Sequence, residues 1–144
     1  MARTTTLGHI ETRIRRDLLN DNEADCCRWT VAQVLSRIRR NVLEVAFKIN
    51  AWAASSQETG KRYYDIQSTL APVETACDLN PPSGVIDDAQ KTTLRAIVMP
   101  IDDRYSDAVA HLAAADLLET DNTDTINAQI ADRYRALGRE AAMK

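Results

Sequence analysis

Aromatic residues are scarce in this sequence, and so are glycine, proline, histidine and cysteine. Aromatic side chains make up 5% of the 144 residues, beside four glycines, four prolines, three cysteines and two histidines. A core with few aromatic rings must be filled by leucine, isoleucine, valine and alanine, which favours packed helices over a β-sandwich. The length suits one core. We therefore expect a mainly α single domain over residues 1–144.

Long apolar runs and a strong charge of either sign are also missing. No stretch approaches the roughly 18 consecutive apolar residues that a membrane-spanning helix needs, and residues 1–4 lack the apolar core of a signal peptide. The formal net charge is −3, whereas proteins that bind duplex DNA normally carry a clearly basic face. We expect no membrane contact and a cytosolic protein when it is made.

Metal-binding spacings are absent from the cysteines and histidines. Adjacent Cys26 and Cys27 cannot easily bridge to each other, and Cys77 makes the set odd. No C-x-x-C or H-x-x-x-H spacing occurs, so a zinc site would have to recruit His9 and His111 from distant positions. We interpret the cysteines as reduced thiols and the histidines as structural, and we expect no metal or cofactor.

Catalytic motifs are missing as well. The sequence has no glycine-rich phosphate loop, no G-x-S-x-G and no H-E-x-x-H. Two carboxylate pairs, Asp102 with Asp103 and Asp121 with Asp124, could hold a cation, but both stand where a helix would begin, and capping explains them. We therefore predict no catalytic residues and no enzyme.

The first part of the chain predicts two helices. Hydroxyls of residues 4–6 can cap the first, and Thr30 with Gln33 forms a capping box for the second, which should reach about residue 55. The apolar face of the first helix is Leu7, Ile10, Ile14 and Leu18, and that of the second is Val31, Leu35, Ile38, Val42, Val45, Ile49 and Trp52. We predict an N-terminal helical hairpin over residues 4–55.

The middle of the chain loses this periodicity. Gly60, Pro72, Pro81, Pro82 and Gly84 argue against a continuous helix. Residues 62–66 and 92–99 are rich enough in aromatic or β-branched side chains to form short strands. We predict a loop with a short β-hairpin over residues 56–100, ordered by neighbouring molecules on assembly.

The last part predicts a second helical hairpin over residues 101–144. Asp102 or Asp103 can cap its first helix, and a short turn leads to the second. The expected core residues are Tyr105, Ala108, Val109, Leu112, Ala115 and Leu118 in the first of these helices, and Ile126, Ile130, Tyr134, Leu137 and Ala141 in the second. Together the two hairpins predict a four-helix bundle-like domain.

Arginines gather on the first two helices. The clusters are Arg13, Arg15 and Arg16, and Arg37, Arg39 and Arg40. A helix-turn-helix protein could place such side chains on phosphates, but solvated helix faces or ion pairs between subunits explain them more simply. The apolar seam of the second helix is too long for a compact recognition helix, so a small helical DNA-binding, packaging or regulatory protein is the alternative reading.

Two blocks of sequence carry a resemblance to a known family. The first is residues 14–21 (Ile-Arg-Arg-Asp-Leu-Leu-Asn-Asp), then Arg28-Trp29-Thr30 and the apolar helix to Phe47. The second is residues 99–108 (Met-Pro-Ile-Asp-Asp-Arg-Tyr-Ser-Asp-Ala), a helix ending in residues 116–121, and a last helix with Asn127-Ala128, Tyr134 and Leu137-Gly138. In content and order these blocks, about three fifths of the chain, resemble the head-to-tail adaptor (connector) proteins of the neck of tailed bacteriophages.

The resemblance implies a structural role rather than a chemical one. Such adaptors form a homo-oligomeric ring, commonly a dodecamer, between the portal protein and tail or other neck proteins, and DNA passes through the lumen without specific binding. The resemblance thus implies that the protein lies in the host cytoplasm before assembly and in the virion neck afterwards. Residues 56–93 depart from the family, whose members often have a fuller set of strands there.

Overall fold

A computed structural model describes residues 4–19, 29–49, 62–78, 86–101, 103–120 and 125–143. Within these residues the chain is mainly helical, as expected, with six α-helices and no strand. The helices are α1 (Leu7–Arg13), α2 (Val31–Glu44), α4 (Arg62–Val73), α5 (Asp88–Arg95), α6 (Ser106–Thr120) and α7 (Thr125–Ala142). π-Helical turns extend α1, α2 and α4 over Ile14–Leu18, Val45–Ile49 and Glu74–Asp78, and a 3₁₀ turn at Asp103–Tyr105 precedes α6.

The starts of α1 and α2 follow the capping signals in the sequence. The Thr30 hydroxyl accepts a hydrogen bond from the Gln33 N–H, and the Gln33 side chain accepts one from the Thr30 N–H, which confirms the predicted capping box. At α1 the N-cap is Thr6, and its reciprocal partner is the ring of His9. In both helices the capping box therefore satisfies the N–H groups of the N-cap residue and of the third helical residue.

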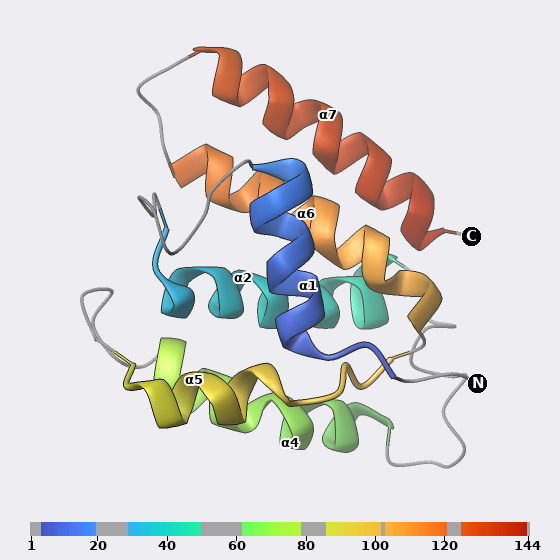
Figure 1. The fold of residues 1–144 in the computed structure, drawn as a ribbon. Helices are drawn as coiled ribbons and strands as arrows, with labels where there is room; N and C mark the ends of the chain where they lie inside the picture. The colour runs from blue at the N-terminus through green and yellow to red at the C-terminus, as the bar shows by residue number, and fades with distance from the viewer. Residues whose placement is uncertain are drawn as a thin grey trace.

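The seam predicted on the second helix is a core face. Val31, Leu35, Ile38, Val42 and Val45 are buried and Ile49 is partly buried, while Trp52 lies outside the described residues. In Figure 1, α1 runs across α2 and α6 instead of lying alongside α2. α2 contacts α1, α4 and α6, so its apolar surface packs against several neighbours.

Both predicted strands of the middle region are wrong. Residues 62–66 belong to α4 and residues 92–95 to α5, and Val98 forms an isolated bridge with Thr6, which is not part of the expected hairpin. Helical spacing had been present in α4, because Ile66, Leu70 and Val73 recur at intervals of four and three and are all buried. Burial of this face outweighed the local β propensity.

Pro72 does not end α4, contrary to expectation. It lies inside the last turn, and the helix then widens into the π-helical turn Glu74–Asp78. A π-turn can accommodate a disturbed hydrogen-bond ladder without ending the helix. The other predicted breaks, at Gly60, Pro81, Pro82 and Gly84, lie outside the described residues.

Helix α5 begins with a capping box, a helix signal that sequence reasoning overlooked because β-branched residues follow it. Asp87 and Gln90 form a third capping box. The hydroxyls of Thr92 and Thr93 donate to the carbonyls four residues earlier, so neither side chain competes with the helix for backbone groups. Leu94 is buried, and this short helix is thereby attached to the core.

Helices α6 and α7 are antiparallel neighbours, as the short connection predicted (Figure 1). All six residues predicted to face the core from Tyr105 to Leu118 are buried. The predicted face of α7 is partly wrong, because Ile126 and Leu137 are 57% and 41% exposed. Instead Ala131, Gly138 and Ala142 face α6, since small residues allow the two backbones to approach closely.

One hydrophobic cluster joins all six α-helices. Its members include Ile10 of α1, Leu35 of α2, Leu70 of α4 and Leu94 of α5, with most of α6. α4 and α5 therefore belong to the same core as the other helices. The predicted division into two hairpins with a loop between them does not describe how this core is built.

The close approach at Gly138 generates a stability prediction. A Cβ atom there would lie 2.7 Å from Leu112 Cγ and 3.2 Å from the Ala108 carbonyl oxygen. Alanine gains about 0.5–1 kcal/mol over glycine in a helix, but overpacking costs about 1–3 kcal/mol. We expect Gly138→Ala to lower the free energy of unfolding by about 1 kcal/mol in denaturant titrations.

The matched test is a double-mutant cycle with Leu112→Ala, which removes the atom in conflict. Gly138→Ala should cost less, or become stabilising, in the Leu112→Ala background. A single Gly138→Ala variant that melts higher than the wild type would contradict the close packing of α6 and α7.

Candidate functional site

A cleft of about 680 Å³ lies between α1 and α5 and is lined mainly by donors of hydrogen bonds. Its walls carry three arginines, Arg15, Arg16 and Arg95, together with threonines from both sides. Among the described lining residues Glu11 is the one carboxylate. The cleft therefore has an excess of positive charge in a protein whose net charge is negative.

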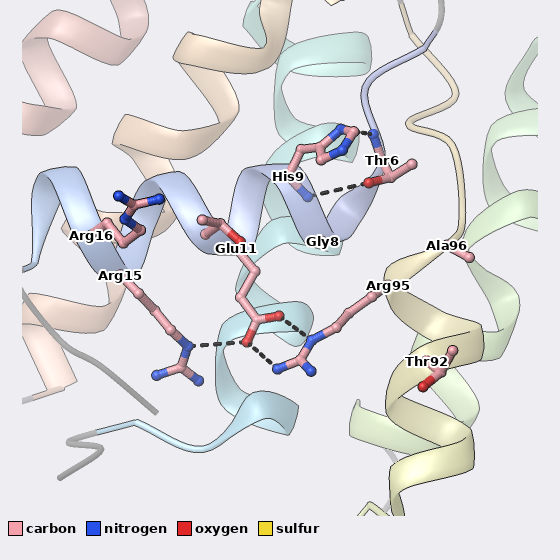
Figure 2. Close-up of a pocket in the computed structure, with 10 residues that line it drawn as sticks. Thr6, Gly8, His9, Glu11, Arg15, Arg16, Thr92, Arg95 and Ala96 are labelled. Atoms are coloured by element: carbon pink, nitrogen blue, oxygen red, sulfur yellow. Dashed lines mark hydrogen bonds and ion pairs between the residues drawn. The ribbon is translucent and has the colours of Figure 1, made fainter. Parts of the chain in front are cut away.

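The centre of the cleft is a buried carboxylate shared by two arginines. Glu11 is 3% exposed. Its Oε1 lies 2.6 Å from Arg95 Nε, and its Oε2 lies 3.1 Å from Arg95 Nη2 and 3.0 Å from Arg15 Nε. Figure 2 shows Glu11 reaching from α1 toward both guanidinium groups, with Arg95 approaching from α5. Burial of this charge is tolerated because both oxygens are paired.

Gly8 makes this geometry possible. A Cβ atom at Gly8 would lie 3.0 Å from Arg95 Cβ and 3.1 Å from the Arg95 carbonyl oxygen. α1 and α5 therefore approach within contact distance one turn before Glu11. A larger residue at this position would push α5 away and lengthen the bonds between Glu11 and Arg95.

Arg15 also connects the cleft to the start of α2. Its Nη1 donates to the Trp29 carbonyl at 3.1 Å, and the buried indole of Trp29 donates to the Thr120 hydroxyl at 3.3 Å. Trp29 is thus a buried packing anchor between α1 and α6. A chain of contacts runs from α5 through α1 to the end of α6.

The first arginine cluster is divided among different contacts. Arg15 is buried in the cleft, and Arg13 forms an ion pair with Asp107 at a distance of 3.3 Å. Arg16 is exposed and points away from Glu11 (Figure 2). In the second cluster, Arg39 forms an ion pair with Glu74 at 3.2 Å, while Arg40 is exposed. The six arginines do not form one surface of the kind that a helix-turn-helix protein presents to phosphates.

Asp103 binds the backbone at the start of the described chain. Its carboxylate accepts hydrogen bonds from the N–H groups of Thr4 and Thr5 and from the Thr4 hydroxyl, at 2.8–2.9 Å. Burial alone would raise the pKa of Asp103, but the hydrogen bonds from Thr5 and Thr4 outweigh it and lower the pKa to about 2. Asp102, Asp121 and Asp124 lie outside the described residues.

The histidines take part in local hydrogen bonds. His9 closes the capping box of α1. His111 Nδ1 lies 2.8 Å from the Asp107 carbonyl oxygen, and the ring meets Tyr134 edge-on. Cys77 is buried, and Cys26 and Cys27 lie outside the described residues. Among the residues that the structure describes, no group of three His, Cys, Asp or Glu side chains could hold a metal ion.

Sequence reasoning missed the pairing of Glu11 with Arg95. The i, i+4 relation of Glu11 and Arg15 is visible in the sequence and predicts a helical ion pair. Arg95 is 84 residues away from Glu11 and stood in a segment predicted to be a strand. Because α5 was not predicted, nothing in the sequence indicated that Arg95 lies beside α1.

Comparison with known protein families, curated proteins and solved structures finds no match to this chain. No helix in the described part of the chain has the length and apolar character needed to cross a membrane.

The buried carboxylate yields a second prediction. Replacing Glu11 with Gln leaves Arg15 in a dry environment without its counter-charge, and breaking such a pair costs about 3–5 kcal/mol. Because Arg95 is one-third exposed, we expect a loss near the lower limit, about 3 kcal/mol. Asp132→Asn is the matched control, since Asp132 is 82% exposed and should change stability by less than about 0.5 kcal/mol. Equal effects in chemical unfolding would exclude a structural role for Glu11.

Asp103 yields a prediction about pH. A carboxyl group with a depressed pKa in the folded state stabilises the protein above its unfolded pKa, 3.8, and this contribution is lost as the pH falls through about 2. We expect Asp103→Asn to be less stable than the wild type near neutral pH, with the difference shrinking below about pH 4. Unfolding titrations across this range measure it; a difference independent of pH would contradict the assignment.

Proposed function

We propose that this protein is a structural subunit of the neck of a tailed bacteriophage. It would form a homo-oligomeric ring between the portal protein and tail or other neck proteins, with DNA passing through the lumen. The role is non-enzymatic and needs no cofactor. Within the subunit we propose a single domain in which α1, α2, α6 and α7 form a bundle-like unit and α4 and α5 are added to it.

The main support for the proposal is the structural role of residues in the two sequence blocks that resemble the adaptor family. Arg15 and Trp29 from the first block bind each other and the end of α6. From the second block, Tyr105 is fully buried and Asp103 holds the backbone of Thr4 and Thr5. Residues with such roles hold the helices together and contribute no reactive groups. This is what we expect of the motif residues of a structural subunit.

Exposed apolar side chains support assembly. Ile126 and Leu137 lie eleven positions apart on α7, which places them on nearly the same side of the helix, about 20° apart. Both are large and exposed. A neighbouring subunit that covers them would remove apolar surface from water, and closure of the ring prevents continued polymerisation.

The test is microscopy of the purified protein, alone and mixed with the portal protein encoded in the same genome. We expect ring-shaped particles in negative stain and a matching mass by light scattering. The double variant Ile126→Glu, Leu137→Glu should lose the ring and keep its melting temperature, because both side chains are exposed. Gln129→Glu, an exposed change on the same helix, is the control and should still assemble.

The contrary results are equally clear. A monomer that leaves the portal protein unbound would exclude the adaptor function. A shift of duplex DNA that weakens steeply with salt would instead favour the alternative, a DNA-binding or packaging protein.

A further inference from the structure

A second concavity of about 270 Å³ lies where α2, α6 and α7 meet. Leu112 and Asp116 of α6 line it together with residues of the two flanking helices. A neighbouring hollow of about 300 Å³ shares Arg40, Glu44 and Lys48 with it. The two hollows therefore lie side by side along this row of shared residues, and together they are here called the α2–α7 groove.

One wall of the α2–α7 groove is fixed by a polar network. The buried Asn41 side chain donates to Asp116 Oδ2 at 2.9 Å. Arg135 contacts Asp116 Oδ1 at 3.5 Å and Glu119 Oε1 at 2.6 Å, and its hydrogen bond to Glu119 raises the pKa of its guanidinium. These side chains satisfy one another and give the groove a defined shape.

Two other arginines of the groove, Arg40 and Arg139, are not part of this polar network. Arg40 and Arg139 are exposed, and within the described part of the chain neither guanidinium has an ion pair or a hydrogen bond. Lys48 is held by Glu44 at 3.5 Å but remains largely exposed. The first hollow thus has four cations, Arg40, Lys48, Arg135 and Arg139, against two carboxylates, Glu44 and Asp116.

The neighbouring hollow adds an apolar surface. Leu43 and Phe47 line it beside Arg39 and Arg40. Both apolar side chains are only partly buried and pack against the core. A ligand that spans the two hollows would meet an apolar spot beside the exposed guanidinium groups of Arg40 and Arg139.

We propose that the α2–α7 groove binds an acidic polypeptide segment that carries an apolar anchor residue. Carboxylates of the segment pair with Arg40 and Arg139, for which guanidinium groups are well suited, and the anchor packs against Leu43 and Phe47. Recognition is specific because the segment must supply both carboxylates and an apolar side chain. The polar side chains of the groove wall already hydrogen-bond to one another, so they hold the shape of the groove.

The groove fits a polypeptide better than duplex DNA. Hollows of about 270 and 300 Å³ admit a few side chains, not a duplex. Glu44 and Asp116 between the cations would repel a continuous row of phosphates but leave room for separate carboxylates. The apolar spot has no counterpart in a phosphate backbone. This inference does not depend on the ring, because it concerns one subunit.

The experiment measures fluorescence anisotropy of a short labelled peptide containing several glutamates and one phenylalanine. The probe is titrated with wild-type protein and with the double variant Arg40→Glu, Arg139→Glu. The matched control is Arg133→Glu with Gln129→Glu and Ala136→Glu, which changes the net charge by the same amount at three exposed residues outside the groove. A duplex oligonucleotide of similar charge is titrated in parallel.

We expect binding by the wild type and the control, and about tenfold or greater weakening in the groove variant, with unchanged melting temperatures. Replacing the phenylalanine of the peptide with glycine should also weaken binding. No binding by the wild type, or equal loss in the groove variant and the control variant, would overturn the proposal. Tighter binding of the duplex with the same dependence on Arg40 and Arg139 would overturn it in favour of a nucleic-acid surface.

Discussion

The burial of α6 on almost every side is the constraint on which the rest of the structure depends. Nine of its residues are buried, and five of these are alanines. A helix with so little side-chain volume leaves voids unless its neighbours come close, and voids cost contact energy. α7 comes close through Gly138, and α2 packs against α6 with its valine, leucine and isoleucine seam. α1 also packs against α6, whereas α4 and α5 join the core through their contacts with α2 and α1.

Charged groups then fix the joints that apolar packing leaves undetermined. Glu11 connects α1 to α5, and Arg15 extends this contact to Trp29. Asp103 connects the start of α6 to the residues before α1. Each contact has directional hydrogen bonds, so it sets a position and an orientation. Several side chains that looked like functional candidates in the sequence are thereby occupied in structure.

The sequence predicted the parts of the fold in which local and tertiary signals agree. The capping box at Thr30 and the seam of α2 specify the same helix, and both were read correctly. α4 and α5 were missed because aromatic and β-branched residues favoured strands locally, while burial of Ile66, Leu70 and Leu94 decided for helices. The face of α7 was misjudged because the pattern ranks isoleucine and leucine above glycine, and close packing reverses that order. The cleft could not be predicted without α5, because Arg95 comes from that helix.

Helix α7 illustrates how one element can serve two neighbours. Leu137 belongs to its exposed apolar edge, whereas Arg139 lines the α2–α7 groove. Two positions along an α-helix turn the side chain by about 200°, so these residues lie on opposite sides of α7. An apolar edge and a basic groove on opposite sides have different chemistry and cannot be covered by one self-complementary patch. Two unlike surfaces suit contacts with two different neighbours, and such heterologous contacts close into a ring where the rotation between subunits closes. In the proposed ring, the apolar edge and the basic groove of α7 would therefore meet different partners.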